Sequence, residues 1–202
     1  TPSELKTLDI EGTKYVVLEE RENNQALVMT ARSIGERKFQ ADSSNGLRQD
    51  GQYNNTYEGS EIDNYLENDW YNRLSSTMKT AIQATNIKQA SYATATDPDS
   101  KQETGYNGQI YNTISRRVFL PSVSEIGKVV ELKNKDKVKA FLINSNSSSI
   151  QTRDSFQGHA DCAEYLAIGP GGLDGVYNVY YAHGVCPAFV IDLSQVNYSV
   201  VK

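Results

Sequence analysis

Hydrophobic residues change from strand spacing to helical spacing and back along the chain, and this change limits the possible folds more than any single motif. Near the N-terminus, two apolar runs, Tyr15 to Leu18 and Ala26 to Met29, flank the turn-forming pair Asn23 and Asn24. Apolar runs separated in this way predict a β-hairpin. The polar stretch 35–59 has little periodicity, and we expect an ordered surface loop there.

The middle of the chain has the helical period. Apolar residues after Ser60 fall on one helix face, at Ile62, Tyr65, Leu66, Trp70 and Leu74. Ser60 and Asp63 occupy N-cap and N3 positions, so a helix is expected to begin there. Because Trp70 lies on the apolar stripe, it is expected to anchor the core in preference to contacting a ligand.

Three further short helices are expected. After a serine cap, the segment 75–87 repeats the apolar pattern at Met78, Ala81 and Ile82. A short strand that ends before Pro121 is followed by Ser122 and Glu125, which form a capping-box pattern and predict the start of a helix. The last of these helices is expected around residues 136–143.

The final third of the chain is predicted to be all β. Its expected strands lie at 149–156, 162–169, 176–182, 187–193 and 197–202. Strand-rich ends around a helical middle predict an α+β fold, with an N-terminal hairpin, two to four short helices and C-terminal antiparallel strands. The 202 residues and the 38% hydrophobic content suit one domain over 1–202.

The charge of the chain argues against a nucleic-acid partner. The formal net charge is -5, and no run of lysine or arginine is present to neutralise phosphates. No segment approaches the ~18 apolar residues of a membrane-spanning helix, so membrane insertion is not expected. The first residues also lack the layout of a signal peptide. We expect synthesis without secretion, or a cell-surface location after removal of a signal.

Groups suited to catalysis or metal binding are few. His159, Asp161 and Glu164 are conceivable metal ligands, but they could equally well be polar residues of a surface turn that bind no metal. Cys162 and Cys186 match no zinc pattern, and buried free thiols are the favoured interpretation. Neighbouring positions on adjacent strands would make them a reactive pair for a copper-dependent oxidase. We favour a protein with no cofactor, no metal and no enzymatic activity.

Tyrosine dominates the aromatic content, with 13 tyrosines against 5 phenylalanines. Tyrosine gives a large rigid contact area with few torsions to freeze, and Ser, Gly and Asn adapt around it, as in paratopes. The segment 175–184 combines this composition with adjacent tyrosines that break a clean strand alternation. We therefore expect part of it to be irregular and to expose several rings. The alternative is that the tyrosines only lie along the edge of a sheet and bind no ligand.

Five segments, taken in order, resemble a domain family of unknown function found in Firmicutes and their phages. They are "GTKYVVLEE" with "QALVMT", "YEGSEIDNYLENDWYNRLSSTMKTAI", "RRVFLPSVSEI", "QTRDSF" and "GVCPAFVIDL". The same order is similar to the C-type-lectin-like fold of formylglycine-generating enzymes and of phage proteins diversified by retroelements. The chain departs from these relatives at residues 150–153, where they often have Trp-Trp-Leu-Arg, and at Cys186, where many have arginine.

The resemblance implies a lectin-like binding module, and we expect a phage or prophage protein of the virion surface that binds a host-surface glycan or protein. The alternative is a structural virion component, such as a capsid decoration or tail protein, that uses the same surface for subunit contacts and forms an oligomer. The expected ligand-binding residues are Arg153, Asp154, Phe156, Gln157, His159, Tyr165, Tyr177, Asn178, Tyr180, Tyr181 and His183. For Arg153 and Asp154, a hydrogen-bonded structural brace is an open alternative.

Overall fold

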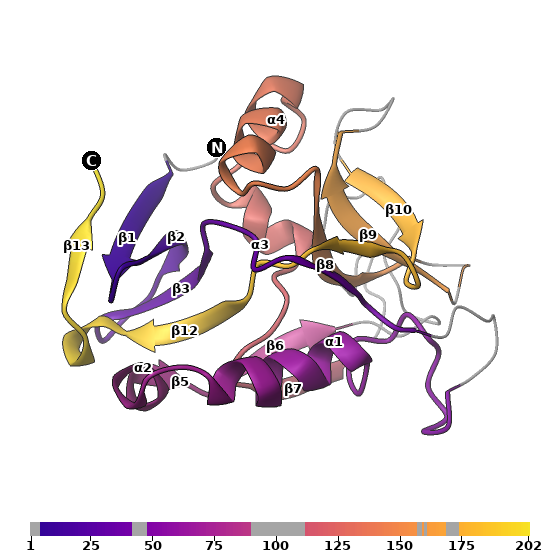
Figure 1. The fold of residues 1–202 in the computed structure, drawn as a ribbon, viewed down its shortest axis with the longest axis horizontal. Coiled ribbons are helices and arrows are strands. Elements are labelled where there is room, and N and C mark those ends of the chain that lie inside the picture. The colour runs from indigo at the N-terminus through magenta and orange to yellow at the C-terminus, as the bar shows by residue number, and fades with distance from the viewer. Residues whose placement is uncertain (1–4, 42–47, 90–111, 157–158, 160, 169–173) are drawn as a thin grey trace.

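Two mainly antiparallel sheets lie between helices in the computed structural model, which describes residues 5–41, 48–89, 112–156, 159, 161–168 and 174–202. In Figure 1, helix α4 (Lys135–Asn144) lies on one side of the sheets, and helices α1 (Glu61–Asn64) and α2 (Ser76–Ala81) lie on the other. This mixture of short helices and mainly antiparallel strands confirms the α+β prediction.

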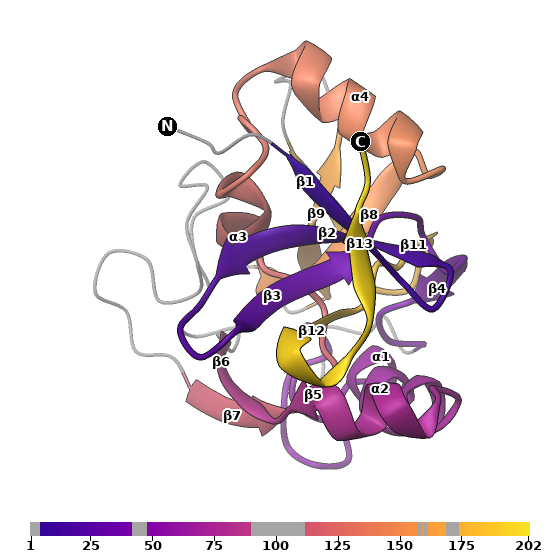
Figure 2. The ribbon, with the colours of Figure 1, turned by 90° about the vertical axis from the view of Figure 1, so that its left-hand side faces the viewer.

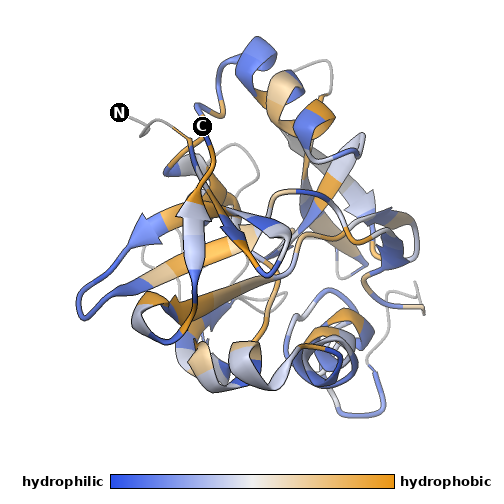
Figure 3. Ribbon diagram, turned by 60° about the vertical axis from the view of Figure 1, so that its left-hand side comes forward, coloured by the Kyte–Doolittle hydropathy of each residue, from blue (hydrophilic) through white to orange (hydrophobic). Residues whose placement is uncertain are grey.

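The first sheet joins the two ends of the chain. Its order is β13-β1-β2-β3-β12-β5, with bounds β1 Lys6–Ile10, β2 Thr13–Glu20, β3 Gln25–Thr30, β5 Ile82–Gln83, β12 Ala188–Asp192 and β13 Tyr198–Val200. Figure 2 shows the C-terminal strand β13 beside β1, and these two strands pair antiparallel. The hydrophobic colour gathers along the central strands in Figure 3, whereas the hairpin turn is hydrophilic.

The predicted N-terminal hairpin is confirmed as β2 and β3. Asn23 and Asn24 have φ angles of 58° and 60°, which belong to the left-handed region. Asparagine adopts this conformation at lower cost than most residues, so the pair closes a tight turn. The two strands of the hairpin bring Val16, Val28 and Met29 into the core, where each is nearly or fully buried.

The second sheet carries most of the residues expected to bind a ligand. Its order is β10-β9-β8-β11-β4, with bounds β4 Glu36–Lys38, β8 Ser149–Ser155, β9 Cys162–Ala167, β10 Asp174–Asn178 and β11 Ala182–Gly184. A smaller sheet pairs β6 (Thr85–Gln89) with β7 (Asn112–Arg116). The predicted strand 176–182 is thus split into β10 and β11, and residues 179–181 form no strand, which confirms the expected irregularity.

Serine caps begin the helices where the sequence predicts them. Ser60 accepts a hydrogen bond from the backbone N–H of Asp63, and the helix continues from α1 through the π-helical segment η1 (Tyr65–Trp70). Ser75 caps α2 in the same way by accepting from Met78. Helix α2 ends at Ala81, however, and the strands β5 and β6 occupy residues that the helical pattern had included. Trp70 packs against Phe189 with ring centroids 6.4 Å apart, as expected for a core anchor.

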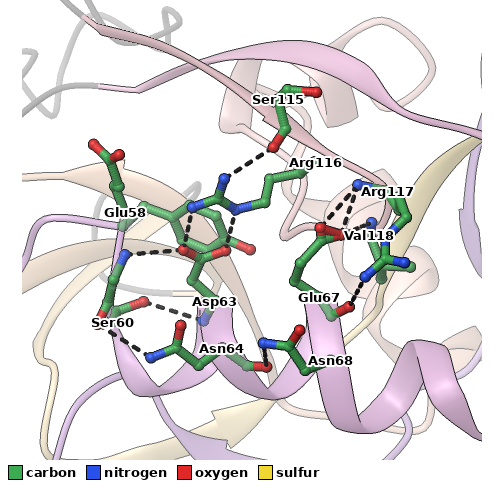
Figure 4. Close-up of polar contacts among 12 residues, drawn as sticks. Glu58, Ser60, Asp63, Asn64, Glu67, Asn68, Ser115, Arg116, Arg117 and Val118 are labelled. Atoms are coloured by element: carbon green, nitrogen blue, oxygen red, sulfur yellow. Dashed lines mark hydrogen bonds and ion pairs between the residues drawn. The ribbon is translucent and has the colours of Figure 1, made fainter.

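Two arginines that follow one another fasten this helix to the end of β7 (Figure 4). Arg116 pairs with the buried carboxylate of Asp63 through two hydrogen bonds of 2.7 and 2.8 Å. The backbone N–H and the Nε of Arg117 donate to Glu67 at 2.7 and 3.2 Å. Because Asp63 and Glu67 are one helical turn apart, both carboxylates face the same neighbouring strand. These contacts fix the angle at which the helix lies below the sheets.

The remaining helices follow Pro121. Helix α3 (Val123–Gly127) begins with the predicted capping box, in which Ser122 and Glu125 satisfy each other's backbone N–H groups. Helix α4 contains the segment predicted at 136–143, and Asn134 is its cap. The short 3-10 helix η5 (Leu193–Gln195) links β12 to the last strand.

The polar stretch 35–59 is not simply a surface loop, which corrects the expectation. Its aromatic side chains Phe39 and Tyr57 are fully buried, with ring centroids 6.2 Å apart. The Tyr57 hydroxyl accepts a hydrogen bond from the backbone N–H of Leu120 at 3.1 Å. The amide of Asn55 donates to three backbone carbonyls between residues 156 and 162. The Tyr57 hydroxyl and the Asn55 amide are accommodated in the interior because each is hydrogen-bonded to backbone groups distant in sequence.

Candidate functional site

Arg153 and Asp154 lie in the core, so the structure favours a brace over a ligand contact. The guanidinium of Arg153 is 1% exposed and pairs with both oxygens of Glu125, at 2.6 and 3.0 Å. It also donates to the carbonyls of Leu120 and Lys88. Asp154 accepts from the backbone N–H of Val123 at 2.7 Å. These bonds tie β8 to the start of α3, and they correct the expectation that the two residues contact a ligand.

The charge state of the brace formed by Arg153 and Glu125 follows from two opposing influences on the pKa of Glu125. Burial by itself raises the pKa of Glu125, because a carboxylate loses hydration in the interior. The adjacent Arg153 guanidinium outweighs burial, and the pKa of Glu125 is lowered. The pair is therefore ionised at neutral pH, and each partner compensates the other's charge.

Three of the expected residues meet in one aromatic cluster on the second sheet. Tyr165 from β9, Tyr177 from β10 and His183 from β11 have ring centroids 4.3 to 5.5 Å apart. Tyr165 is fully buried, which corrects its expected contact with a ligand, whereas Tyr177 is 36% exposed. The cluster therefore has a buried side and an open side, and Tyr177 forms the open one.

Polar atoms of the same cluster are held inside the sheet. His183 forms a hydrogen bond through Nδ1 with the Ser149 hydroxyl, and the side-chain amide of Gln151 donates to the Arg37 carbonyl. Within the described part of the chain, the Tyr165 hydroxyl and His183 Nε2 are buried without a hydrogen-bond partner. Burial lowers the pKa of His183, and the nearby Glu36 opposes this shift only in part. The imidazole is therefore neutral at pH 7.

The turn between β10 and β11 displays the other two expected tyrosines. Tyr180 and Tyr181 are 45% and 60% exposed, and Lys38 of β4 places its ammonium 3.7 Å from the centre of the Tyr180 ring. Such a cation over an aromatic face is attracted by the ring quadrupole. We call Tyr177, Tyr180, Tyr181 and Lys38 together the tyrosine surface.

Hydrogen bonds fix the backbone that carries this surface. The Asn178 amide donates to Asp161 at 3.0 Å, and its carbonyl oxygen accepts from the N–H of Tyr180 at 2.8 Å. The backbone N–H of Val179 donates to the Asp161 carbonyl at 2.8 Å, and the Val179 side chain is fully buried. Asn178, expected to bind a ligand, therefore positions the tyrosines through its side chain.

A hollow of about 290 Å³ lies beside the tyrosine surface. Its lining residues are Glu36, Arg37, Lys38, Ala41, Glu61 and Ile62. Lys38 belongs to both features, so the hollow continues from the tyrosine surface onto a charged wall. Sequence reasoning missed Lys38, because no local pattern marks a lysine of a three-residue strand within a polar stretch.

The remaining expected residues lie at the other end of β8. Phe156 is half-buried and stacks on the exposed His159, with ring centroids 5.2 Å apart. The backbone carbonyls of both residues accept hydrogen bonds from the side-chain amide of Asn55. Gln157 lies outside the described residues. The structure thus brings together only part of the predicted set.

The structure gives no support to a thiol or metal centre in its described part. No three histidine, cysteine, aspartate or glutamate side chains there are grouped to hold a metal ion. Cys162 and Cys186 are free, and they do not lie on adjacent strands: Cys162 pairs with Asn178, whereas Cys186 follows β11 and bonds with Thr30. Burial raises the pKa of Cys162 to about 11 and that of Cys186 to about 12. Both thiols are therefore protonated at neutral pH.

Comparisons with known proteins identify the family. No helix in the described ranges has the length and apolar character needed to cross a bilayer. Neither the curated proteins nor the solved structures contain a match to the chain. The model of one family, "Domain of unknown function (DUF6273)", matches residues 23–193. This match covers most of the chain and confirms the expected family of unknown function. The chain therefore belongs to the DUF6273 family.

Proposed function

We propose that the chain is a non-enzymatic binding module that recognises a glycan or protein on a bacterial host surface through the tyrosine surface. The observation that carries this proposal is the exposure of Tyr177, Tyr180 and Tyr181 on a hydrogen-bonded backbone. Tyrosine rings on a fixed backbone lose little conformational entropy on binding. They also offer both an apolar face and a hydroxyl to a polar ligand.

The neighbouring charges support a polar ligand. Lys38 supplies a cation over Tyr180, and the adjacent hollow is lined by Glu36, Arg37 and Glu61. A ligand that stacks on the rings therefore meets donors and acceptors at the same time. The raised pKa values of both thiols, about 11 and about 12, disfavour thiolate chemistry and support a binding role over an oxidase.

The resemblance noted in the sequence extends the proposal to the fold and the location. We propose that the fold is C-type-lectin-like and that the protein lies on the surface of a phage or prophage virion. A structural role in the same particle, with the tyrosine surface buried against a second subunit, is the competing outcome of the experiment below.

Binding to host surfaces tests the proposal directly. The full chain, labelled with a fluorophore, is presented to an array of bacterial glycans and to purified cell-wall sacculi of Firmicutes. Tyr177, Tyr180 and Tyr181 are then changed together to alanine. Each ring at the centre of an interface contributes roughly 1–2 kcal/mol, so we expect binding to fall by at least about a hundredfold. Cooperative thermal unfolding is expected to remain.

The control changes one exposed tyrosine elsewhere. Tyr198 of β13 is 46% exposed on the other sheet, and Tyr198→Ala is expected to bind like the parent chain. Equal loss in both variants, or unchanged binding by the triple variant, contradicts the proposal. Light scattering measures the oligomeric state of the parent chain and of the triple variant. If the parent is an oligomer and the triple variant is a monomer, the tyrosine surface forms subunit contacts instead.

A further inference from the structure

A second and larger cavity lies away from the tyrosine surface. Its volume is about 570 Å³, which falls within the range of about 300–1,000 Å³ that small-molecule sites occupy. It lies between the strands β2 and β3 and the end of the helix that contains Trp70. The lining residues are Gly12, Thr13, Lys14, Tyr15, Thr30, Arg32, Ile34, Trp70, Arg73 and Leu74. None of them belongs to the tyrosine surface or to the hollow beside it.

The floor of the cavity is aromatic and apolar. Tyr15 is 4% exposed, and Trp70 is half-buried next to the partly buried Leu74. Phe189 supports both rings from below, with centroids 5.4 Å from Tyr15 and 6.4 Å from Trp70. A flat apolar group that enters the cavity therefore meets two aromatic rings that are already fixed by packing.

The rim of the cavity carries charge of one sign. Lys14, Arg32 and Arg73 line it and are exposed, and no carboxylate is among the lining residues. Within the described residues none of the three forms an ion pair, although Arg73 donates to the Tyr65 hydroxyl at 3.4 Å. In a chain with a net charge of -5, three unpaired cations around one cavity are a local reversal of charge. Such a rim attracts an anion and repels a cation.

The walls are held in place before any ligand arrives. The Ser75 hydroxyl, just after the helix, donates to the carboxylate of Glu11 at 2.8 Å, and this bond ties the helix end to the β1–β2 turn. The backbone N–H of Ala31 donates to the Lys14 carbonyl at 2.9 Å, and Thr30 donates to the Arg32 carbonyl at 2.8 Å. These bonds fix the backbone positions of two rim cations. A preformed site loses little affinity to ordering.

We propose that this cavity binds an organic anion with a flat, largely apolar body. The body lies against Trp70 and Tyr15, and the carboxylate or phosphate group lies among Lys14, Arg32 and Arg73. An inorganic anion uses the rim alone and leaves the aromatic floor empty, whereas a neutral ring uses the floor alone. The combination of the two is what selects this ligand class.

The only tryptophan in the sequence is Trp70, so its fluorescence reports on this cavity alone. The test titrates the full chain with three compounds that share one ring and differ in charge: benzoate, benzyl alcohol and benzylamine. We expect benzoate to change the Trp70 emission saturably and to bind at least about fivefold more tightly than benzyl alcohol. Benzylamine is expected to bind most weakly. Phenyl phosphate serves as a fourth arm, and the tighter of the two anions identifies the acidic group of the ligand.

Two triple variants with equal change of net charge separate local from global electrostatics. Lys14, Arg32 and Arg73 are changed to glutamine in the first. In the second the same change is made at Lys133, Lys135 and Lys139, which are exposed near and within α4. We expect the first variant to weaken benzoate binding at least tenfold and to bring it level with benzyl alcohol. The second is expected to bind like the parent.

Circular dichroism checks that each variant still unfolds cooperatively, so that a loss of binding is not caused by misfolding. Benzoate that binds no more tightly than benzylamine overturns the proposal, as does equal loss in the two triple variants. Inorganic sulfate that competes as well as benzoate also overturns it, since the aromatic floor then contributes nothing.

Discussion

At the scale of single residues, burial decides which predicted contacts are available to a ligand. Arg153 and Tyr165 are of the residue types that bind ligands in proteins, but both are sealed inside the monomer. Tyr180 and Tyr181 come from the same tyrosine-rich composition and are open to solvent. Composition alone therefore does not distinguish a buried ring from an exposed one, because the elements that cover each ring decide its exposure. The partner of Arg153, Glu125, lies on another element and was beyond the reach of local patterns.

Glu125→Gln tests the buried brace. The substitution keeps the shape of the side chain and removes the charge that compensates Arg153. An unpaired buried guanidinium destabilises a fold strongly, so we expect a loss of roughly 3–5 kcal/mol in the free energy of unfolding. Urea unfolding followed by circular dichroism measures it. Glu20→Gln, at an exposed ion pair with Lys6, is the control and is expected to leave the midpoint nearly unchanged. Equal midpoints for both variants would show that the brace does not stabilise the fold.

His183 gives the fold a dependence on pH. Burial lowers the pKa of His183 from its usual 6.5, so the folded state holds this imidazole neutral while the unfolded state protonates it near 6.5. The unfolded state then binds more protons, and stability falls as the pH drops below about 6.5 towards the lowered pKa. Unfolding free energies of the parent and His183→Gln between pH 7.5 and 5.5 measure this contribution. We expect a smaller slope in the variant, and identical slopes would refute the assignment.

At the scale of secondary structure, the accuracy of the sequence predictions follows the range of the interactions. The hairpin turn at Asn23 and Asn24 and the caps at Ser60 and Ser75 depend on neighbouring residues, and the structure confirms them. The end of α2 was wrong, because pairing of β5 with β12 overrides the helical pattern. The stretch 35–59 was wrong for the same reason: its aromatic residues are buried by elements distant in sequence.

Ser75→Ala tests the cap of α2. The alanine cannot accept the hydrogen bond from the N–H of Met78, so we expect a loss of about 1 kcal/mol in stability. Ser76→Ala is a matched control at the next position, because Ser76 lies inside the helix and provides no cap. Thermal unfolding of the two variants is compared with the parent. A larger effect at Ser76 than at Ser75 would contradict the assigned start of the helix.

At the scale of the whole molecule, the two sheets separate two surfaces of different character. The tyrosine surface lies on the second sheet, where β10 and the turn between β10 and β11 expose three rings, and Lys38 of β4 lies over one of them. The cationic cavity lies against the first sheet and the helix with Trp70. The sequence indicated the first surface through its tyrosines. It did not indicate the second, whose three cations come from separate segments and meet only in the folded chain.

The most direct test of the central claim is chemical footprinting of the tyrosines with a nitrating reagent, read by mass spectrometry, with and without bound cell-wall sacculi. In the free chain we expect Tyr180 and Tyr181 to react and the buried Tyr165 to stay unmodified. With sacculi bound, the account predicts protection of Tyr177, Tyr180 and Tyr181 while Tyr198 keeps its reactivity. Protection of Tyr198 with continued nitration of Tyr180 and Tyr181 would contradict it.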